Sequence, residues 1–302
     1  MPVSDRKRAA LPGDPAARVD GLVELARDAR KADQDLLAFD YLREALLLDN
    51  YHKQGLDLIR PTLDRYRQQT QPLWLPVRER WRASEDDTRH HQMKSFALFA
   101  LDLIKVDEKG RHYRGTGRKL EDHYAYGAPF FAVADGTVVE VRDGFPDNPI
   151  GRIDGRYEKH NGLAIQHGNG EYSWYVHAKN GTLTVKQGDR VRRGQKLGLI
   201  GNSGGSAIPH LHFTLVAYRG ISVPWTCDDY TLFAPDGTSI PVERAWPREG
   251  WTIQADQPEV PPAAADAPAP ADRPGDPQGA PGAGDKAGDT PGDGPGDAAG
   301  QE

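Results

Sequence analysis

Residues 162–202 read GLAIQHGNGEYSWYVHAKNGTLTVKQGDRVRRGQKLGLIGN. Short apolar runs at Leu163–His167, Tyr172–His177 and Lys196–Ile200 alternate here with turns rich in Gly and Asn. The turn residues favour tight reversals of the chain, and the runs between them are strand-like. The stretch therefore predicts neighbouring strands of an antiparallel sheet.

The same pattern extends on both sides of this stretch. A strand-like region begins at Trp74, and a short β extension follows Trp225. Many short strands, tight glycine turns and few helical stretches predict a mainly β protein, built as an antiparallel β-sandwich or small barrel. We expect it to occupy residues 71–253, with a core at 75–219 and an extension at 220–253. Further strands are predicted at Phe96–Val106, Phe130–Val141, Thr182–Val185 and His210–Tyr218.

Segments of different composition flank this β domain. Residues 1–17 are polar and punctuated by proline, and we expect them to be loose. Apolar residues in 18–70 recur at helical spacing and predict two or three short helices. Residues 254–302 hold almost no large apolar side chains, so they cannot bury enough surface to offset the entropy of ordering. We expect a disordered tail rich in Pro, Gly, Ala and Asp.

The charge is concentrated in the same C-terminal segment. The formal net charge is −6, and residues 254–302 contain ten Asp and Glu against Arg273 and Lys286, a balance of −8. The rest of the chain therefore carries about +2 and has no basic stripe, which argues against a nucleic-acid partner. No run approaches the ~20 apolar residues of a membrane span.

The number of cysteines and the composition of the N-terminus give information about where in the cell the protein is found. Cys227 is the only cysteine, so an intrachain disulfide and a thiolate metal cluster are both excluded. We interpret it as a small buried hydrophobe rather than a nucleophile. The first residues carry charge but lack the apolar stretch of a signal peptide. Two interpretations stay open: the protein remains inside the cell, or the sequence lacks an export segment.

The string PHLHF puts two histidines two residues apart. Side chains alternate along a strand, so His210 and His212 point to one face, opposite Leu211 and Phe213. Two imidazoles on one face suit a shared metal ion or a proton-transfer site. The pair alone is more simply explained by two surface histidines, so the metal hypothesis needs further ligands.

A carboxylate in an apolar strand supplies one such ligand. Asp102 lies in SFALFALDLIKV, where an unpartnered charge is costly to bury, and no Arg or Lys lies two residues away. A divalent cation would stabilise it, and His90 and His91 lie just upstream. His177 is a further candidate because it ends a strand beside a glycine turn, on the same face as Tyr175. The histidines interpreted as loop or surface residues are His112, His123, His160 and His167.

With these residues assembled, the region from about Leu75 to Arg219 resembles the lysostaphin/LytM-type zinc endopeptidases, peptidoglycan hydrolases of the β-lytic metallopeptidase type. The resemblance covers about half the chain and follows the family's order. The strings that carry it are HH…FALD, YGAPFFAVADGTVVEV, GLAIQHGNGEYSWYVHA, VKQGDRVRRGQKLGLIGNSGGS and PHLHF.

The resemblance implies a role for each candidate side chain. His91, Asp102 and His212 would bind Zn²⁺, His210 would be the general base, and His177 would help to hold the oxyanion. Ten residues separate His91 from Asp102, where the family's short motif has three. His90 therefore remains an alternative to His91 as the first ligand.

The function implied by the resemblance is that of a zinc metalloendopeptidase. It would hydrolyse peptide cross-links of bacterial peptidoglycan as a monomer, at the cell envelope or after secretion, and either glycine bridges or D-amino-acid/diaminopimelate links fit. The alternative is a catalytically silent peptidoglycan-binding adaptor of the same fold. A biotinyl- or lipoyl-carrier module is disfavoured because no modifiable lysine is found at a hairpin tip.

Overall fold

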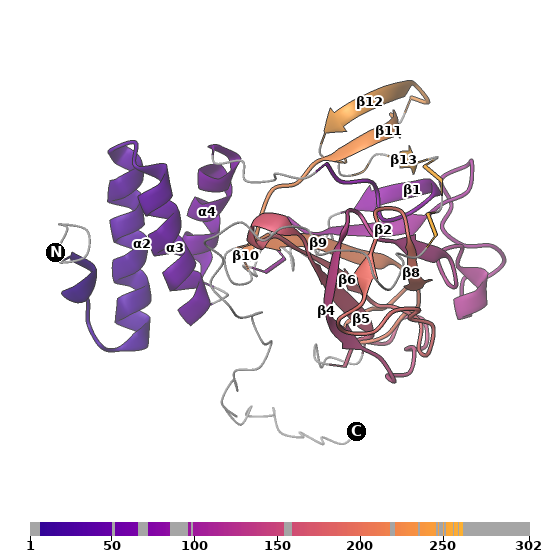
Figure 1. Ribbon diagram of the computed structural model, residues 1–302, viewed down its shortest axis with the longest axis horizontal. Helices are drawn as coiled ribbons and strands as arrows, with labels where there is room; N and C mark the ends of the chain where they lie inside the picture. Colours follow the sequence, from indigo (N-terminus) through magenta and orange to yellow (C-terminus); the bar gives the residue numbers. More distant parts are fainter. Residues whose placement is uncertain are drawn as a thin grey trace, which may run out of the picture.

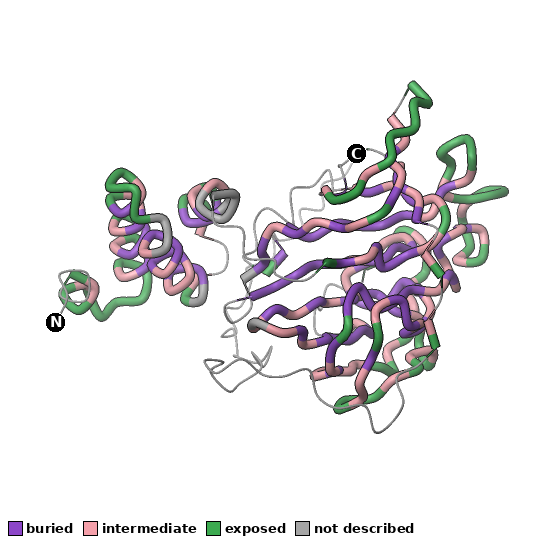
Figure 2. Tube along the Cα trace, turned by 45° about the horizontal axis from the view of Figure 1, so that its top comes forward, coloured by how far each residue is buried: buried purple, intermediate pink, exposed green. Residues whose placement is uncertain are grey.

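The computed structural model describes residues 7–49, 52–65, 72–84, 96–97, 99–153, 159–217, 221–234, 236–245, 247, 250, 252–255, 257–258 and 260–261. Figures 1 and 2 show two parts, with the N-terminal helices on one side and a β domain on the other. Much of the predicted tail, residues 262–302, lies outside the described residues.

Three of the helices described in the N-terminal part pack on one another. They are α2 (Pro15–Lys31), α3 (Asp35–Leu48) and α4 (Lys53–Arg65). Helix α2 begins at Pro15 because the Asp14 carboxylate accepts a hydrogen bond from the Ala17 N–H at 2.9 Å. An ion pair from Arg18 to Glu44, at 2.6 Å, joins α2 to α3. In the part of the chain that is described, no helix has the length and apolarity that a membrane crossing requires.

The β domain is built around one large antiparallel sheet. Its strands are β1 (Glu79–Ser84), β2 (Leu101–Lys105), β4 (Gly136–Arg142), β5 (Gly162–Gln166), β6 (Tyr172–Val176), β7 (Arg190–Val191), β9 (Leu211–Ala217), β10 (Ile221–Ser222), β11 (Cys227–Phe233), β12 (Ser239–Ala245) and β13 (Thr252–Ala255). Over the described ranges they run in the order β12-β11-β13-β1-β2-β9-β6-β5-β4-β7, and β10 pairs with β9. The C-terminal extension thus joins the core sheet through the β13–β1 pair.

A second, two-stranded sheet forms another layer of the domain. It pairs β3 (Pro129–Phe131) with β8 (Lys196–Leu199), and short 3₁₀ turns, η2 (Leu120–Asp122) and η3 (Gly168–Gly170), lie in the connections. Phe130 of β3 stacks on Tyr175 of β6, with ring centroids 5.7 Å apart. Aromatic side chains therefore fill the space between the sheets. The prediction of a mainly antiparallel β fold is confirmed.

The core continues beneath the centre of the large sheet. The ring of Phe213 on β9 lies 5.3 Å from that of Tyr175 and 4.8 Å from that of Trp225, both in edge-to-face contact. The Trp225 indole N–H donates to the Phe99 carbonyl at 2.8 Å, so its polar edge is satisfied. Cys227, at the start of β11, is fully buried, as expected of a small hydrophobe.

Three predicted strands differ from the observed ones, and in each the backbone makes hydrogen bonds outside a strand ladder. Phe130–Val141 divides into β3 and β4, since the Val133 N–H between them donates to the Tyr175 hydroxyl at 2.9 Å. Among the described residues of Phe96–Val106, the strand covers Leu101–Lys105, and the Phe99 N–H donates to Ser222 Oγ at 2.7 Å. Thr182–Val185 is irregular backbone that holds β8 through isolated bonds, among them Thr184 N–H to the Leu197 carbonyl at 2.9 Å.

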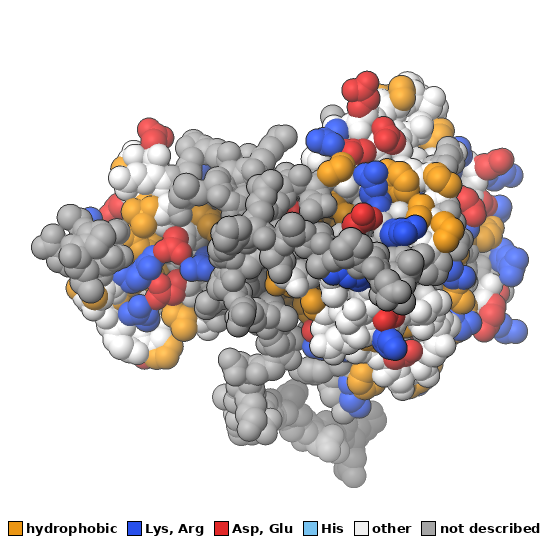
Figure 3. All heavy atoms as spheres, viewed as in Figure 1, with side chains coloured by type: hydrophobic (Ala, Val, Ile, Leu, Met, Phe, Trp, Pro, Cys, Tyr) orange, Lys and Arg blue, Asp and Glu red, His pale blue; other side chains and the backbone are white. Residues whose placement is uncertain are grey.

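The face of the molecule seen in Figure 3 mixes Lys and Arg with Asp and Glu over the β domain. This view agrees with the near-neutral balance of residues 1–253.

Candidate active site

The centre of the large sheet brings two predicted ligands together from distant parts of the chain. In the β2–β9 ladder, Asp102 lies directly opposite His212, and in the β6–β9 ladder Val176 lies opposite His212. Residues directly opposite each other share a face of the sheet. Asp102 and His212 therefore lie on one face, while their neighbours Leu211 and Phe213 point into the core.

The Asp102 carboxylate meets two imidazoles on that face. Its Oδ1 lies 3.0 Å from His212 Nδ1 and 3.5 Å from His210 Nε2. His210 lies immediately before β9, and its ring turns to the same side as His212. All three side chains are only about a tenth exposed, at 11% or 12%. The nearly buried carboxylate thus lies within hydrogen-bond distance of His212, as the apolar setting of Asp102 demands.

His177 reaches this face through a change in backbone conformation. Strict alternation puts it on the core face with Tyr175, but its φ of 70° is left-handed and turns the side chain away from that face. Its ring centroid lies 4.6 Å from that of His210 and 6.0 Å from that of His212. The conformation is unfavourable for a non-glycine residue and is held by Gly201 N–H donating to the His177 carbonyl at 2.8 Å.

On two of the three imidazole rings, a backbone carbonyl determines which nitrogen carries the hydrogen. His177 Nδ1 lies 2.7 Å from the Ser203 carbonyl oxygen, and His210 Nδ1 lies 2.8 Å from the Ile208 carbonyl oxygen. A carbonyl oxygen only accepts, so each Nδ1 carries a hydrogen and each neutral ring keeps its lone pair on Nε2. Burial, and then the neighbouring His210 and His212, hold the pKa of His177 well below its ordinary value.

The distance between Asp102 and His212 is compatible with a shared zinc ion. Bonds of about 2.0–2.1 Å to a tetrahedral zinc put neighbouring ligand atoms ~3.3 Å apart, close to the 3.0 Å between Asp102 Oδ1 and His212 Nδ1. Among the described residues, no cluster of three or more His, Cys, Asp and Glu has the arrangement of a complete metal site. His90 and His91 lie outside the described residues. The spacing of Asp102 and His212, the two described residues of the predicted ligand set, is therefore compatible with adjacent positions around a zinc ion.

Two histidines outside this cluster lie outside the strands, as a loop residue does, but are buried and so are not surface residues. His167 is 3% exposed, with Nδ1 donating to the Asp135 carbonyl at 2.8 Å and Nε2 2.7 Å from Ser173 Oγ. His123 is 4% exposed and donates through Nε2 to the Gly117 carbonyl at 3.0 Å. Their partners are backbone and hydroxyl groups, so both histidines serve the fold.

Sequence reasoning missed the polar residues that hold the site histidines. Ser203 and Ser206 contact His177 and His210, and Asn202 contacts Ser206. All three lie in the string GNSGGS, which contributed to the family resemblance but received no individual roles. The signal available was a cluster of small polar residues just before an HxH pair.

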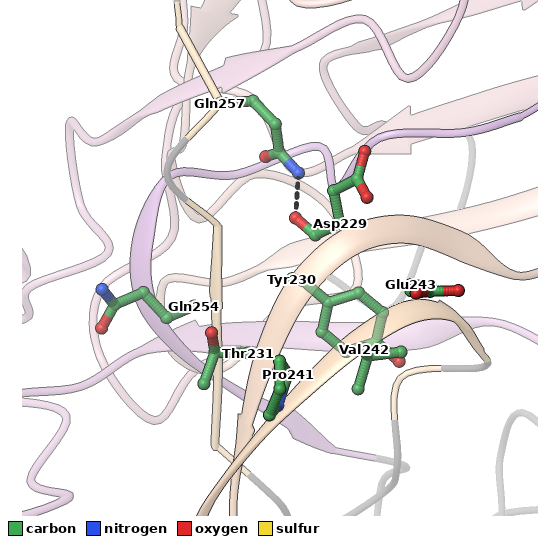
Figure 4. A pocket seen from close by; sticks show the side chains of 8 residues that line it. All are labelled: Asp229, Tyr230, Thr231, Pro241, Val242, Glu243, Gln254 and Gln257. Atoms are coloured by element: carbon green, nitrogen blue, oxygen red, sulfur yellow. Dashed lines mark hydrogen bonds between the residues drawn. The ribbon is translucent and has the colours of Figure 1, made fainter.

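A separate hollow lies on the C-terminal extension. Figure 4 shows it between β11, β12 and the segment after β13, where the Gln257 side-chain amide donates to the Asp229 carbonyl at 2.6 Å. Strand β1 stands between this extension and the β2–β9 pair. The hollow is therefore distinct from the histidine cluster. Its lining residues are Asp229, Tyr230, Thr231, Pro241, Val242, Glu243, Gln254 and Gln257.

The sequence around these histidines is similar to that of known peptidases. The model of "Peptidase family M23" matches residues 119–223, which include His177, His210 and His212. Lipoprotein NlpD of Yersinia enterocolitica is 35% identical over 97 residues, covering 32% of this chain and 84% of that protein. The chain belongs to peptidase family M23. The family resemblance drawn from the sequence is thus confirmed.

Other M23 relatives are longer than the region they share with this chain. Peptidoglycan DD-endopeptidase ShyA of Vibrio cholerae is 30% identical over 167 residues, which is 55% of this chain but only 30% of ShyA. The crystal structure of a zinc-containing peptidase from Vibrio cholerae is 24% identical and covers 52% of this chain and 35% of that chain, with a TM-score of 0.29. That structural likeness is too low to carry an argument.

Proposed function

We propose that this M23 protein is a zinc-dependent endopeptidase that hydrolyses peptide cross-links of bacterial peptidoglycan at the cell envelope. The observation that carries the proposal is the meeting of Asp102 with His212 and His210 on one face of the central strands. The name of ShyA, a peptidoglycan DD-endopeptidase, supports the substrate class. The proposal assigns the activity to residues 71–253 and leaves the helical segment 18–70 and the tail outside it.

In this proposal Asp102, His212 and His91 hold the metal ion. The 3.0 Å approach of Asp102 Oδ1 to His212 Nδ1 supports the first two ligands, and His91 stays a prediction from the sequence, with His90 as its alternative. Bound zinc would supply a water whose pKa is lowered towards ~7, and would polarise the scissile carbonyl.

The other two histidines act on the proton and on the developing charge. His210 accepts the proton of the attacking water at Nε2, while the Ile208 carbonyl holds the ring through Nδ1–H at 2.8 Å. His177 stands beside it with Nδ1–H on the Ser203 carbonyl at 2.7 Å. The lowered pKa of His177 leaves its Nε2 without a proton at rest, and the negative charge that develops on the oxyanion would favour a second proton there. His177 would then donate to the oxyanion, an effect worth about 3–4 kcal/mol for one such donor.

Two variants test the division of roles. His210→Ala is expected to retain zinc and lose hydrolysis, whereas Asp102→Ala is expected to lose the metal. His52→Ala is the matched control because His52 lies in the helical part and contacts Asp20. The assay combines elemental analysis with mass spectrometry of fragments released from purified peptidoglycan. Full turnover by His210→Ala contradicts its role as base.

The same assay decides between the enzyme and the adaptor. Release of cleaved cross-links supports the peptidase, and the masses of the fragments identify the bond as a glycine bridge or a D-amino-acid/diaminopimelate link. Binding to peptidoglycan with every cross-link intact assigns the chain to the catalytically silent adaptors instead.

A further inference from the structure

Two buried side chains behind His210 take no part in the reaction as proposed. Ser206 is 1% exposed and Asn202 is fully buried. Both lie in the segment 201–206, which also holds His177 through the Ser203 carbonyl. One short segment therefore contacts the Nδ1 atoms of both histidines.

The hydroxyl of Ser206 faces three partners. Its Oγ lies 2.7 Å from Asn202 Oδ1, 2.8 Å from the Ile208 carbonyl oxygen and 3.1 Å from His210 Nδ1. Both of those oxygens can only accept, so the single hydroxyl proton goes to one of them. A lone pair of Oγ then faces the His210 ring.

His210 Nδ1 consequently meets two acceptors, Ser206 Oγ and the Ile208 carbonyl oxygen. A hydrogen on Nδ1 can be donated to either, whereas a lone pair there would face the Ile208 carbonyl oxygen, which can only accept, at 2.8 Å. The lone pair of the neutral ring therefore lies on Nε2, the atom that is 3.5 Å from Asp102 Oδ1.

Asn202 ties this arrangement to a neighbouring segment. Its side-chain amide donates to the Asn148 carbonyl at 2.9 Å, which orients Oδ1 towards Ser206, and its backbone N–H donates to Asp147 Oδ1 at 2.7 Å. The Asn148 N–H returns a bond to the Asn202 carbonyl at 2.9 Å. The contacts of the His210 ring are thus connected, through Ser206 and Asn202, to residues 147 and 148.

We propose that Ser206 and Asn202 are positioning residues that hold His210 with its hydrogen on Nδ1 and its lone pair on Nε2. The proposal deepens the proposed function and rests on it in one respect, that His210 accepts a proton. The placement of the hydrogen itself rests only on the contacts of Ser206, Asn202 and Ile208.

The kinetic test compares substitutions of Ser206 in the full, zinc-loaded chain, with a soluble cross-linked muropeptide as substrate. Ser206→Ala is expected to lower kcat about three- to tenfold with little change in KM, because one neutral hydrogen bond to the ring is lost. Ser206→Thr keeps the hydroxyl and is expected to restore kcat to within about twofold of the wild type. An equal loss of kcat in both variants indicates a packing role and overturns the proposal.

Ser173→Ala is the matched control. Ser173 is also a fully buried serine next to a histidine nitrogen, at 2.7 Å from His167, but it lies on the core face of β6. We expect this variant to lower the melting temperature and to leave kcat unchanged.

Nitrogen-15 NMR of the histidine rings tests the proposal without any substrate. In the wild type, His210 is expected to give one neutral form with hydrogen on Nδ1, and in Ser206→Ala a second form with hydrogen on Nε2 joins it. A wild-type ring with hydrogen on Nε2, or a Ser206→Ala ring that keeps the single Nδ1 form, overturns the proposal. A wild-type chain that releases no fragments refutes the proposed function, whereas the NMR comparison still decides the role of Ser206.

Discussion

The buried His167 makes the stability of the β domain depend on pH in a calculable way. Burial lowers its pKa from 6.5 to about 4, against a smaller opposite effect of the Asp135 carbonyl. Between these values the unfolded chain binds a proton on this side chain and the folded chain does not. Its contribution to stability is therefore fully present above about pH 6.5 and is lost as the pH falls towards 4.

The size of the effect follows from the same two pKa values. Each unit of difference is worth about 1.4 kcal/mol, so the full contribution is about 3 kcal/mol, of which about 2 kcal/mol is lost between pH 7.5 and pH 5. In His167→Gln this titration is absent. The free energy of unfolding of the variant should therefore fall by about 2 kcal/mol less than that of the wild type over the same interval.

Urea unfolding at the two pH values measures this difference. All six tryptophans follow residue 73, so their fluorescence reports the β domain and not the helices. Effects of other titrating groups, including those around the metal ligands, are common to both proteins and cancel in the comparison. Equal losses of stability in the wild type and in His167→Gln would refute the reasoning.

Three further predictions concern the metal, the site backbone and the core. Removal of zinc by a chelator is expected to abolish hydrolysis and to lower the melting temperature, because a ligand that binds the folded state stabilises it. Added Zn²⁺ is expected to restore both. A chelated protein with full activity contradicts this prediction. Gly201→Ala is expected to lower the free energy of unfolding by about 1–3 kcal/mol and to reduce kcat, since an added Cβ would clash with Lys179 Cα at 2.5 Å and with Asp147 Oδ1. Urea unfolding measures the stability and the fragment assay measures the activity. A variant with unchanged stability counts against the packing argument. Phe213→Leu is expected to lower the free energy of unfolding by about 1–2 kcal/mol because it loses both edge-to-face contacts. An unchanged midpoint of urea unfolding would contradict a contribution of these contacts.

The sequence predicts correctly the strands whose apolar run and bounding glycine turns all lie within a few consecutive residues. Leu163–His167 and Tyr172–His177 match β5 and β6 to within one residue at each end, because glycine turns bound both runs. Thr182–Val185 has the composition of a strand but irregular backbone, since the pairing that makes a strand depends on distant partners. The break between β3 and β4 likewise depends on a hydroxyl 42 residues from Val133.

The candidate site was predictable in its chemistry but not in all its geometry. Asp102 stands out in the sequence because a carboxylate in an apolar strand requires a partner, for which a divalent cation is predicted. The structure puts His212, 110 residues away, 3.0 Å from this carboxylate. The position of His177 was not predictable from alternation, because one left-handed residue moves its ring to the other face. The burial of His167 was missed because its acceptor, the Asp135 carbonyl, is 32 residues distant.

The most direct test of the account is a paired digestion of purified peptidoglycan by the wild-type chain and by His210→Ala, with zinc content measured on the same samples. We expect about one zinc ion per chain in both proteins, with cleaved cross-links released by the wild type alone. A wild-type protein that holds zinc and leaves every cross-link intact, or a His210→Ala variant that cuts as well as the wild type, would contradict it.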